Sequence, residues 1–122
     1  MLRTMLKSKI HRATLTGADL HYEGSITVDA GLMEKADILN GEQVHVLNVN
    51  TGDRLVTYAI PAPRGSGTVL LNGPAARLGA AGDPVVILTY CEVEEELVRK
   101  WKPLVILVDS KNRPRAKKRS RS

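Results

Sequence analysis

Short stretches of alternating apolar and polar residues run along most of the chain. Alternation with a period of two is typical of strands that bury one face. Turn residues such as Gly, Asn, Asp and Pro separate the stretches. The sequence therefore predicts about seven short strands. Their ranges are 3–15, 26–28, 43–49, 54–60, 68–71, 85–91 and 104–108.

A few short helical segments interrupt these strands. Asp29 is placed to cap a helix over 32–36, and Asn72 is placed to cap a single turn that follows it. Residues 92–101 carry acids early and cations late, as a helix dipole favours. The two most apolar strands, 85–91 and 104–108, are predicted to be buried. Turns are expected at 16–19, 50–53 and 79–84, and a loop at 61–67.

The predicted fold is mainly β, a barrel or a sandwich with a few short helices. A chain of 122 residues forms one domain with a modest core. It has no apolar run long enough to cross a bilayer and no signal-peptide pattern at its start. The lone Cys91 is predicted to be a buried thiol, which indicates a reducing cytoplasm. No spacing of Cys, His and carboxylates is typical of a metal site.

The positive charge of the chain is concentrated at its end. The net charge is +5, but residues 111–122 hold seven of the 18 basic residues and no acid. Residues 1–110 have 11 basic against 13 acidic residues. We therefore expect a slightly acidic domain over 1–110 and a disordered basic tail over 111–122. The domain is also short of exposed aromatic residues that stack on bases, so we do not expect nucleic-acid binding. A barrel that binds RNA through its tail is the rival hypothesis.

The Gly24-Ser25 pair has two interpretations. The ordinary one is a turn that enters the strand at 26–28. In the other, the Ser25 hydroxyl attacks the carbonyl of Gly24, which has no Cβ to obstruct it. The acyl group would shift from nitrogen to oxygen, and elimination would cut the chain. The dehydroalanine left at residue 25 would hydrolyse to a pyruvoyl group. The dipeptide alone leaves both interpretations open.

Several polar side chains on the predicted strands are candidates for a site. Alternation puts Arg54 and Tyr58 on one face and Thr57 on the other. Lys9 shares a face with Lys7 and His11, which is ordinarily a solvated face. Backbone N–H groups at the turn over 72–75 suit an anion, although a plain helix cap is the simpler interpretation. Taken singly, none of these side chains indicates a function.

Taken together, the motifs resemble the aspartate 1-decarboxylase family, small pyruvoyl-dependent enzymes that make β-alanine for pantothenate synthesis. The resemblance runs in order over about residues 1–110. One departure is Pro74, where the family often has Ala; a proline provides no N–H for substrate. The matching segments are 6–13, 21–25, 40–44, 54–60, 64–67 and 72–76.

The resemblance implies a double-psi β-barrel that assembles as a homotetramer with active sites between subunits. It implies self-cleavage into a β chain of 1–24 and an α chain of 25–122. Decarboxylation of L-aspartate to β-alanine would proceed through a Schiff base to the pyruvoyl group, without metal or PLP. By this resemblance Gly24, Ser25 and Thr57 serve the cleavage, and Tyr58 is the proton donor. The substrate-binding residues would be Lys9, Arg54, Thr57, Asn72, Gly73, Pro74 and Ala75.

Elementary chemistry agrees with these implied roles. A dicarboxylate substrate needs fixed cations, which an arginine and a lysine provide. A pyruvoyl ketone is an electron sink of the kind that PLP offers, and a phenol can protonate the resulting carbon. The role of His11 stays open, as do the need for a maturation factor and the purpose of the tail. A pyruvoyl decarboxylase for another amino acid is the rival among enzymes.

Overall fold

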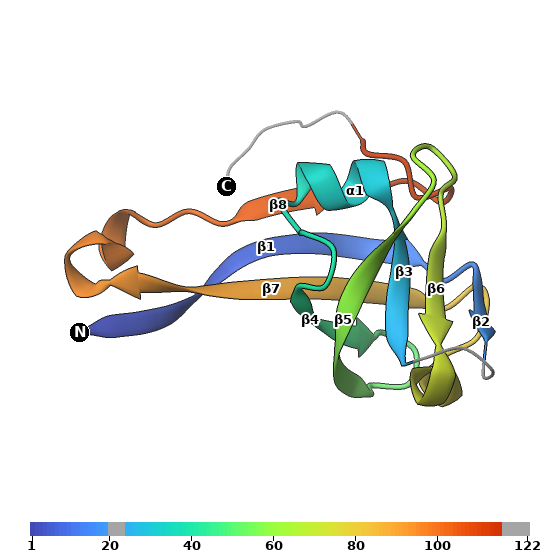
Figure 1. Ribbon diagram of the computed structural model, residues 1–122. Coiled ribbons are helices and arrows are strands. Elements are labelled where there is room, and N and C mark those ends of the chain that lie inside the picture. The colour runs from blue at the N-terminus through green and yellow to red at the C-terminus, as the bar shows by residue number, and fades with distance from the viewer. Residues whose placement is uncertain (20–23, 116–122) are drawn as a thin grey trace.

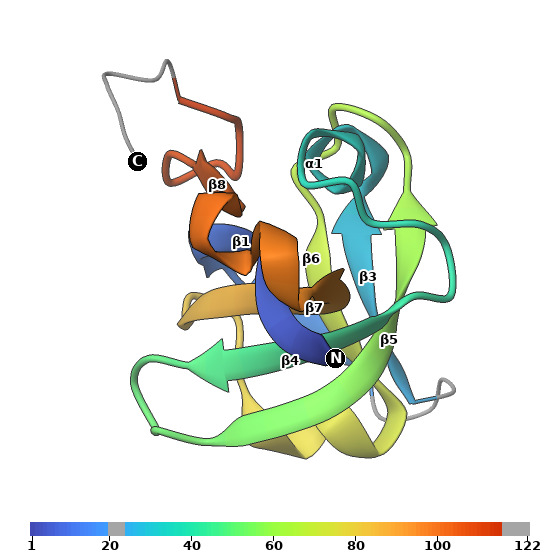
Figure 2. The same ribbon diagram turned by 90° about the vertical axis from the view of Figure 1, so that its left-hand side faces the viewer.

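A single mixed sheet curls into a barrel in the computed structural model, which describes residues 1–19 and 24–115 (Figures 1 and 2). Within this described part, eight strands follow the order β2-β6-β3-β5-β4-β7-β1-β8. The prediction of a mainly β barrel with a few short helices is confirmed. In chain order the elements are β1 (Leu2–Thr14), β2 (Gly17–Asp19), β3 (Ser25–Asp29), α1 (Ala30–Lys35), β4 (Gln43–Asn48), β5 (Arg54–Ala62), β6 (Val69–Asn72), η1 (Gly73–Leu78), β7 (Pro84–Glu94), η2 (Glu95–Lys100) and β8 (Leu104–Leu107).

Aliphatic side chains fill the core, as the near absence of aromatic residues requires. Every second residue of the central strands points inward, as the alternation predicts. Helix α1 covers part of this core with Leu32 and Met33. Its N-cap is Asp29, as predicted, and the carboxylate accepts a hydrogen bond of 2.7 Å from the Gly31 N–H. The largest fully buried apolar side chains are Ile10, Leu15, Ile26, Leu32, Leu71 and Ile87.

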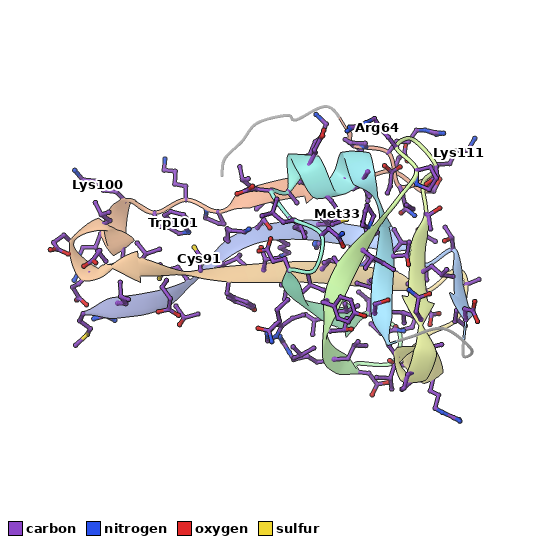
Figure 3. All side chains as sticks on the ribbon, viewed as in Figure 1. Met33, Arg64, Cys91, Lys100, Trp101 and Lys111 are labelled. Carbon is purple, nitrogen blue, oxygen red and sulfur yellow. The ribbon has the colours of Figure 1, made fainter. Side chains whose placement is uncertain are left out.

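The longest strands, β1 and β7, pair over their whole length and extend beyond the barrel as an arm (Figure 1). The arm is fastened by two bonds of 2.9 Å between Arg3 and Glu95. Trp101 also donates its indole N–H to the Leu6 carbonyl at 2.7 Å. Figure 3 shows Trp101 and Cys91 along this arm. Cys91 is half-buried, so the prediction of a buried thiol is wrong.

Three predicted elements differ in the structure. The expected turn at 16–19 contains β2, which pairs in parallel with β6. The expected helix over 92–101 is shorter, because β7 continues to Glu94 and only Glu95–Lys100 is helical. Strand β8 is not buried: Leu104 is 46% exposed, because β8 pairs with β1 at the edge of the sheet.

The start of the basic segment packs against the barrel. Asn112 is buried and donates hydrogen bonds of 2.8 Å to the carbonyls of Thr14 and Gly67. A Cβ on Gly67 would lie 2.7 Å from the Lys111 carbonyl oxygen, so this glycine permits a close approach. Figure 3 shows Lys111 and Arg64 at the same end of the barrel. The ordered part therefore reaches at least residue 115, and the disorder expected for 116–122 lies outside the described residues.

Candidate active site

Ser25 begins β3 with a fully buried side chain. Its partner across the antiparallel pair is Asn72 at the end of β6. The Asn72 side-chain amide donates to Ser25 Oγ at 2.9 Å and to Thr27 Oγ1 at 2.7 Å. Thr27 lies two residues after Ser25 and so shares its face of the strand. The sheet register therefore fixes the Ser25 hydroxyl from a second strand.

The predicted capping role of the Asn72 side chain is wrong. Asn72 precedes η1, but its side chain makes no capping hydrogen bond. Its amide instead bonds across the sheet, because the register of β6 places it opposite Ser25. Gly73 then turns the chain into η1 with a φ of +64°, in the left-handed region that favours glycine. The loop over 72–75 thus starts at the serine itself.

Pro74 lies against Gly24, the residue before the serine. A Cβ built on Gly24 would be 3.5 Å from Pro74 Cδ. Pro74 is exposed, whereas the next residue, Ala75, packs against the core. Since proline has no N–H, only Gly73 and Ala75 can offer backbone donors from these three loop positions. The His21, Tyr22 and Glu23 motif residues lie outside the described part of the chain.

Thr57 and Tyr58 lie on β5, the parallel neighbour of β3. The recorded register starts at Ile26↔Ala59. Continuing it by one residue, to the first residue of β3, puts Ser25 opposite Tyr58. Paired residues share a face of the sheet, so Tyr58 lies on the same face as Ser25, and Thr57, its neighbour on β5, points to the other face. Tyr58 is 36% exposed, which leaves its hydroxyl open to a substrate.

Lys9 lies on the outer face of the sheet, far from the serine. In the sheet register Lys9 of β1 is paired with Leu88 of β7, Leu88 with His45 of β4, and His45 with Val56 of β5. This row crosses four strands, and three strand spacings separate Lys9 from Val56 by about 14 Å. Strand β5 still lies between this row and β3, which carries Ser25. One chain therefore does not bring Lys9 to Ser25.

Arg54 shares the outer face with Tyr58 but begins the strand. Four residues separate them, a distance of about 13 Å along an extended strand. The Arg54 guanidinium lies 3.0 Å from His45 Nδ1. In the described ranges 1–19 and 24–115, neither Arg54 nor Lys9 forms an ion pair, whereas nearby Lys7 contacts Glu42 at 2.7 Å.

His11 belongs to a different part of the surface. It lines a cavity of about 200 Å³, and the other predicted site residues are not part of its lining. Burial lowers the pKa of His11, and the positive charges of Lys9 and Arg12 lower it further. Its Nδ1 is buried and has no hydrogen-bond partner among the described residues. The other lining residues are Arg12, Leu107, Val108, Asp109, Ser110 and Arg115.

The sequence patterns did not point to two residues that contact predicted site residues. Thr27 shares the Asn72 amide with Ser25, and alternation along β3 could have placed it on the serine's face. His45 contacts Arg54, and the register of the predicted hairpin could have placed it beside this arginine. The described residues include no group of three or more His, Cys, Asp or Glu side chains that could hold a metal ion. No helix in the described ranges is long and apolar enough to cross a membrane.

The fold is a small β-barrel, and its outer face carries Lys9 and Arg54, which form no ion pair with the residues that the structure describes. A family model described as aspartate decarboxylase matches residues 1–115, which is most of the chain. The chain therefore belongs to the aspartate decarboxylase family. It is a carboxy-lyase that acts on aspartate in the pantothenate pathway, and the match supports the double-psi form of the barrel.

Proposed function

We propose that the chain cuts itself between Gly24 and Ser25 and uses the resulting pyruvoyl group to convert L-aspartate to β-alanine and CO2. The observation that carries this proposal is the buried Ser25 hydroxyl, which Asn72 holds at 2.9 Å. Hydroxyls buried at a strand start ordinarily serve packing alone. Here the preceding residue is a glycine, which leaves the carbonyl open to attack.

The bond changes of the cleavage balance with one water molecule. Ser25 Oγ bonds to the Gly24 carbonyl carbon, and the peptide C–N bond breaks to leave an ester. Loss of the Ser25 Cα proton and of the Gly24 carboxylate gives dehydroalanine, and its hydrolysis releases ammonia. Asn72 orients the hydroxyl for the first step, and Thr57 of β5, the strand that pairs in parallel with β3, assists the cleavage.

The pyruvoyl group fits the position of Ser25, because the residue is buried beside a polar amide that can hold a carbonyl oxygen. Such a group would supply a ketone that can react with the substrate amine and accept the electron pair that the departing CO2 leaves on the substrate carbon. Tyr58 shares the face of Ser25, and its phenol donates the proton to the carbon that has lost CO2.

Arg54 and Lys9 bind the carboxylates of the substrate. A guanidinium can grip one carboxylate with two hydrogen bonds, and an ammonium can act on the other as a point charge. The 72–75 loop lines the pocket, where Gly73 and Ala75 offer N–H groups and Pro74 offers only its ring. These contacts hold the bond to the departing carboxylate in a fixed orientation.

The working unit is a homotetramer with active sites between neighbouring subunits, in the cytoplasm. The separation of about 14 Å between Lys9 and Val56 of one chain supports this assembly. The apolar and aromatic residues exposed on the same outer face also support it, since Val56 is 52% and Tyr90 37% exposed. A neighbouring copy would bring its own Lys9 to the Ser25 of the first.

The direct test is proton NMR of aspartate incubated with the purified, self-cleaved protein. We expect β-alanine to appear with the wild type and with Arg64→Ala. Arg64 is a suitable control because it is an exposed arginine that pairs with Glu34 at 2.7 Å. Arg54→Ala should still cleave its chain but should lose aspartate turnover. If Arg54→Ala turned over aspartate as the wild type does, the assignment of aspartate to this site would be wrong.

A further inference from the structure

His45 is the side chain that holds Arg54 in the described part of the chain. Arg54 lies two residues before Val56, the strand partner of His45, so the two side chains are diagonal neighbours on one face. The guanidinium nitrogen Nη1 lies 3.0 Å from His45 Nδ1. A guanidinium has donors only, so Nδ1 must be the acceptor and the ring proton must lie on Nε2.

Tyr90 holds the other side of the imidazole. It lies two residues after Leu88, the partner of His45 on β7. The two ring centroids are 5.0 Å apart with an interplanar angle of 68°, an edge-to-face contact. His45 is therefore fixed by an aromatic ring on one side and contacts a cation on the other, which limits its freedom to rotate.

A neutral imidazole orients Arg54 without cancelling its charge. A carboxylate partner would hold the guanidinium equally well but would compete with an anionic substrate for it. The hydrogen bond to Nδ1 uses one of the five guanidinium N–H groups. The remaining donors are free to grip a carboxylate with two hydrogen bonds.

We infer that His45 is a positioning residue that presents Arg54 to the substrate carboxylate in its neutral form and releases it when protonated. This inference rests on the proposed carboxylate-binding role of Arg54. An imidazolium cannot accept a hydrogen bond and repels a guanidinium. Apparent affinity for the dicarboxylate should therefore fall as the pH is lowered through the range of about 5 to 8, in which imidazoles titrate.

The other charged and titratable groups on this face come from three strands. Arg54 and Tyr58 lie on β5, Tyr90 and Glu92 on β7, and Lys9 on β1, one strand beyond Leu88. His11 lies off this site and lines the cavity at the C-terminal turn. A difference between wild type and a His45 variant therefore reports His45.

Three variants separate the possible roles of His45. His45→Asn keeps an acceptor near the position of Nδ1 and cannot be protonated in this range. His45→Phe keeps the ring that packs against Tyr90 but removes the acceptor. His45→Asp keeps an acceptor but neutralises Arg54. Thermal melts of all three identify any variant that fails to fold, and mass spectra show whether each still cuts its chain.

We expect KM for aspartate to rise about five- to tenfold in His45→Phe and in His45→Asp, with a smaller change in kcat, since the lost contact acts on binding. His45→Asn should stay within about twofold of wild type at pH 8. Wild-type KM should rise from pH 8 to pH 5.5, whereas KM of His45→Asn should stay nearly flat. An unchanged KM in His45→Phe, or a wild-type KM that falls at low pH, would overturn the inference.

Binding of succinate, a dicarboxylate without an amine, separates this inference from the proposed function. Calorimetry should give a Kd that weakens in Arg54→Ala and, to a lesser extent, in His45→Phe. If Arg54→Ala bound succinate as the wild type does, the carboxylate-binding role of Arg54 would fail. If Arg54→Ala lost succinate while His45→Phe retained full affinity, only the role of His45 would fail.

Discussion

The neighbourhood of Ser25 and the outer face that carries Lys9 and Arg54 are built in opposite ways. Ser25 and Asn72 are 0% and 1% exposed, and hydrogen bonds across adjacent strands hold them. Lys9 and Arg54 are not buried, form no ion pair within the described ranges, and lie several strands apart. The single chain thus brings together the groups proposed for self-cleavage but leaves the groups proposed for substrate binding dispersed. This difference is expected if a neighbouring subunit completes the site.

The largest effect is expected when two inactive variants are mixed, which tests whether Lys9 and Ser25 of one site come from different subunits. Ser25→Ala lacks the precursor of the cofactor, and Lys9→Ala lacks a substrate cation. Random tetramers of the two should recover about a quarter of wild-type turnover, because a quarter of the inter-subunit sites contain both intact residues. The measurement is β-alanine production after co-expression. Mixed tetramers without any activity would show that Lys9 and Ser25 must come from one chain.

Replacing the phenol should separate catalysis from self-cleavage. Tyr58→Phe should lower kcat by about 10²- to 10⁴-fold, the usual loss for a general acid, while the chain still cuts itself. The matched control is Tyr90→Phe, since Tyr58 and Tyr90 are 36% and 37% exposed. Loss of Tyr90's hydroxyl leaves its ring against His45 and should change kcat less than twofold. Equal losses in the two variants would remove the special role of Tyr58.

Two buried asparagines offer a matched test of the cross-sheet contact. Asn72→Ala and Asn112→Ala each remove an amide that is 1% exposed and should each cost about 1–3 kcal/mol in free energy of unfolding. Only Asn72→Ala should also slow cleavage at Ser25, by about tenfold for the loss of one orienting hydrogen bond. Gel analysis of cleavage over time gives the rates. Equal cleavage rates would show that Asn72 does not orient the serine.

The smallest expected effect is the one of Asp29 on how the free energy of unfolding depends on pH. Burial raises the pKa of Asp29, but hydrogen bonds from the backbone N–H groups of Gly67, Gly65 and Gly31 outweigh it, and the net pKa is lowered. A lowered pKa stabilises the fold above the unfolded value of about 3.9, and this contribution is lost as pH falls through the folded value.

Asp29→Asn should therefore cost about 1–3 kcal/mol at pH 7 and much less near pH 3. Urea unfolding at the two pH values measures it. A cost that did not depend on pH would mean that the charge of Asp29 is not what the three glycine N–H groups stabilise. Because Asp29 lies at the far end of β3 from Ser25, cleavage should continue in this variant.

Local patterns predicted most of the strands but not their surroundings. The hairpin of β4 and β5 follows from alternation and a tight turn, and the structure places both strands within two residues of the prediction. Apolar content alone suggested that β8 is buried, yet it lies at the sheet edge, where Leu104 is exposed. Whether an apolar strand is buried depends on its place in the sheet, which pairing between distant segments decides.

The same limit applies to the site. Motifs in sequence order predicted Ser25, Tyr58 and Arg54 as site residues, and these stay predictions, but the role expected for the Asn72 side chain was wrong because its partner is 47 residues away. His45 was missed for a related reason. Its importance comes from two diagonal contacts, with Arg54 on one strand and Tyr90 on another. Register between strands creates these contacts, and no short motif encodes it.

The most direct test of the account is an intact mass spectrum of the purified chain beside Ser25→Ala and Ser8→Ala. Ser8 is the matched control, a second serine with 0% exposure that hydrogen-bonds to Thr89. We predict two fragments, 1–24 and 25–122, for the wild type and Ser8→Ala, with the larger lighter by one ammonia than a chain that starts with serine. Ser25→Ala should stay whole. A wild-type chain that remained uncut after prolonged warm incubation would contradict self-cleavage at Gly24-Ser25.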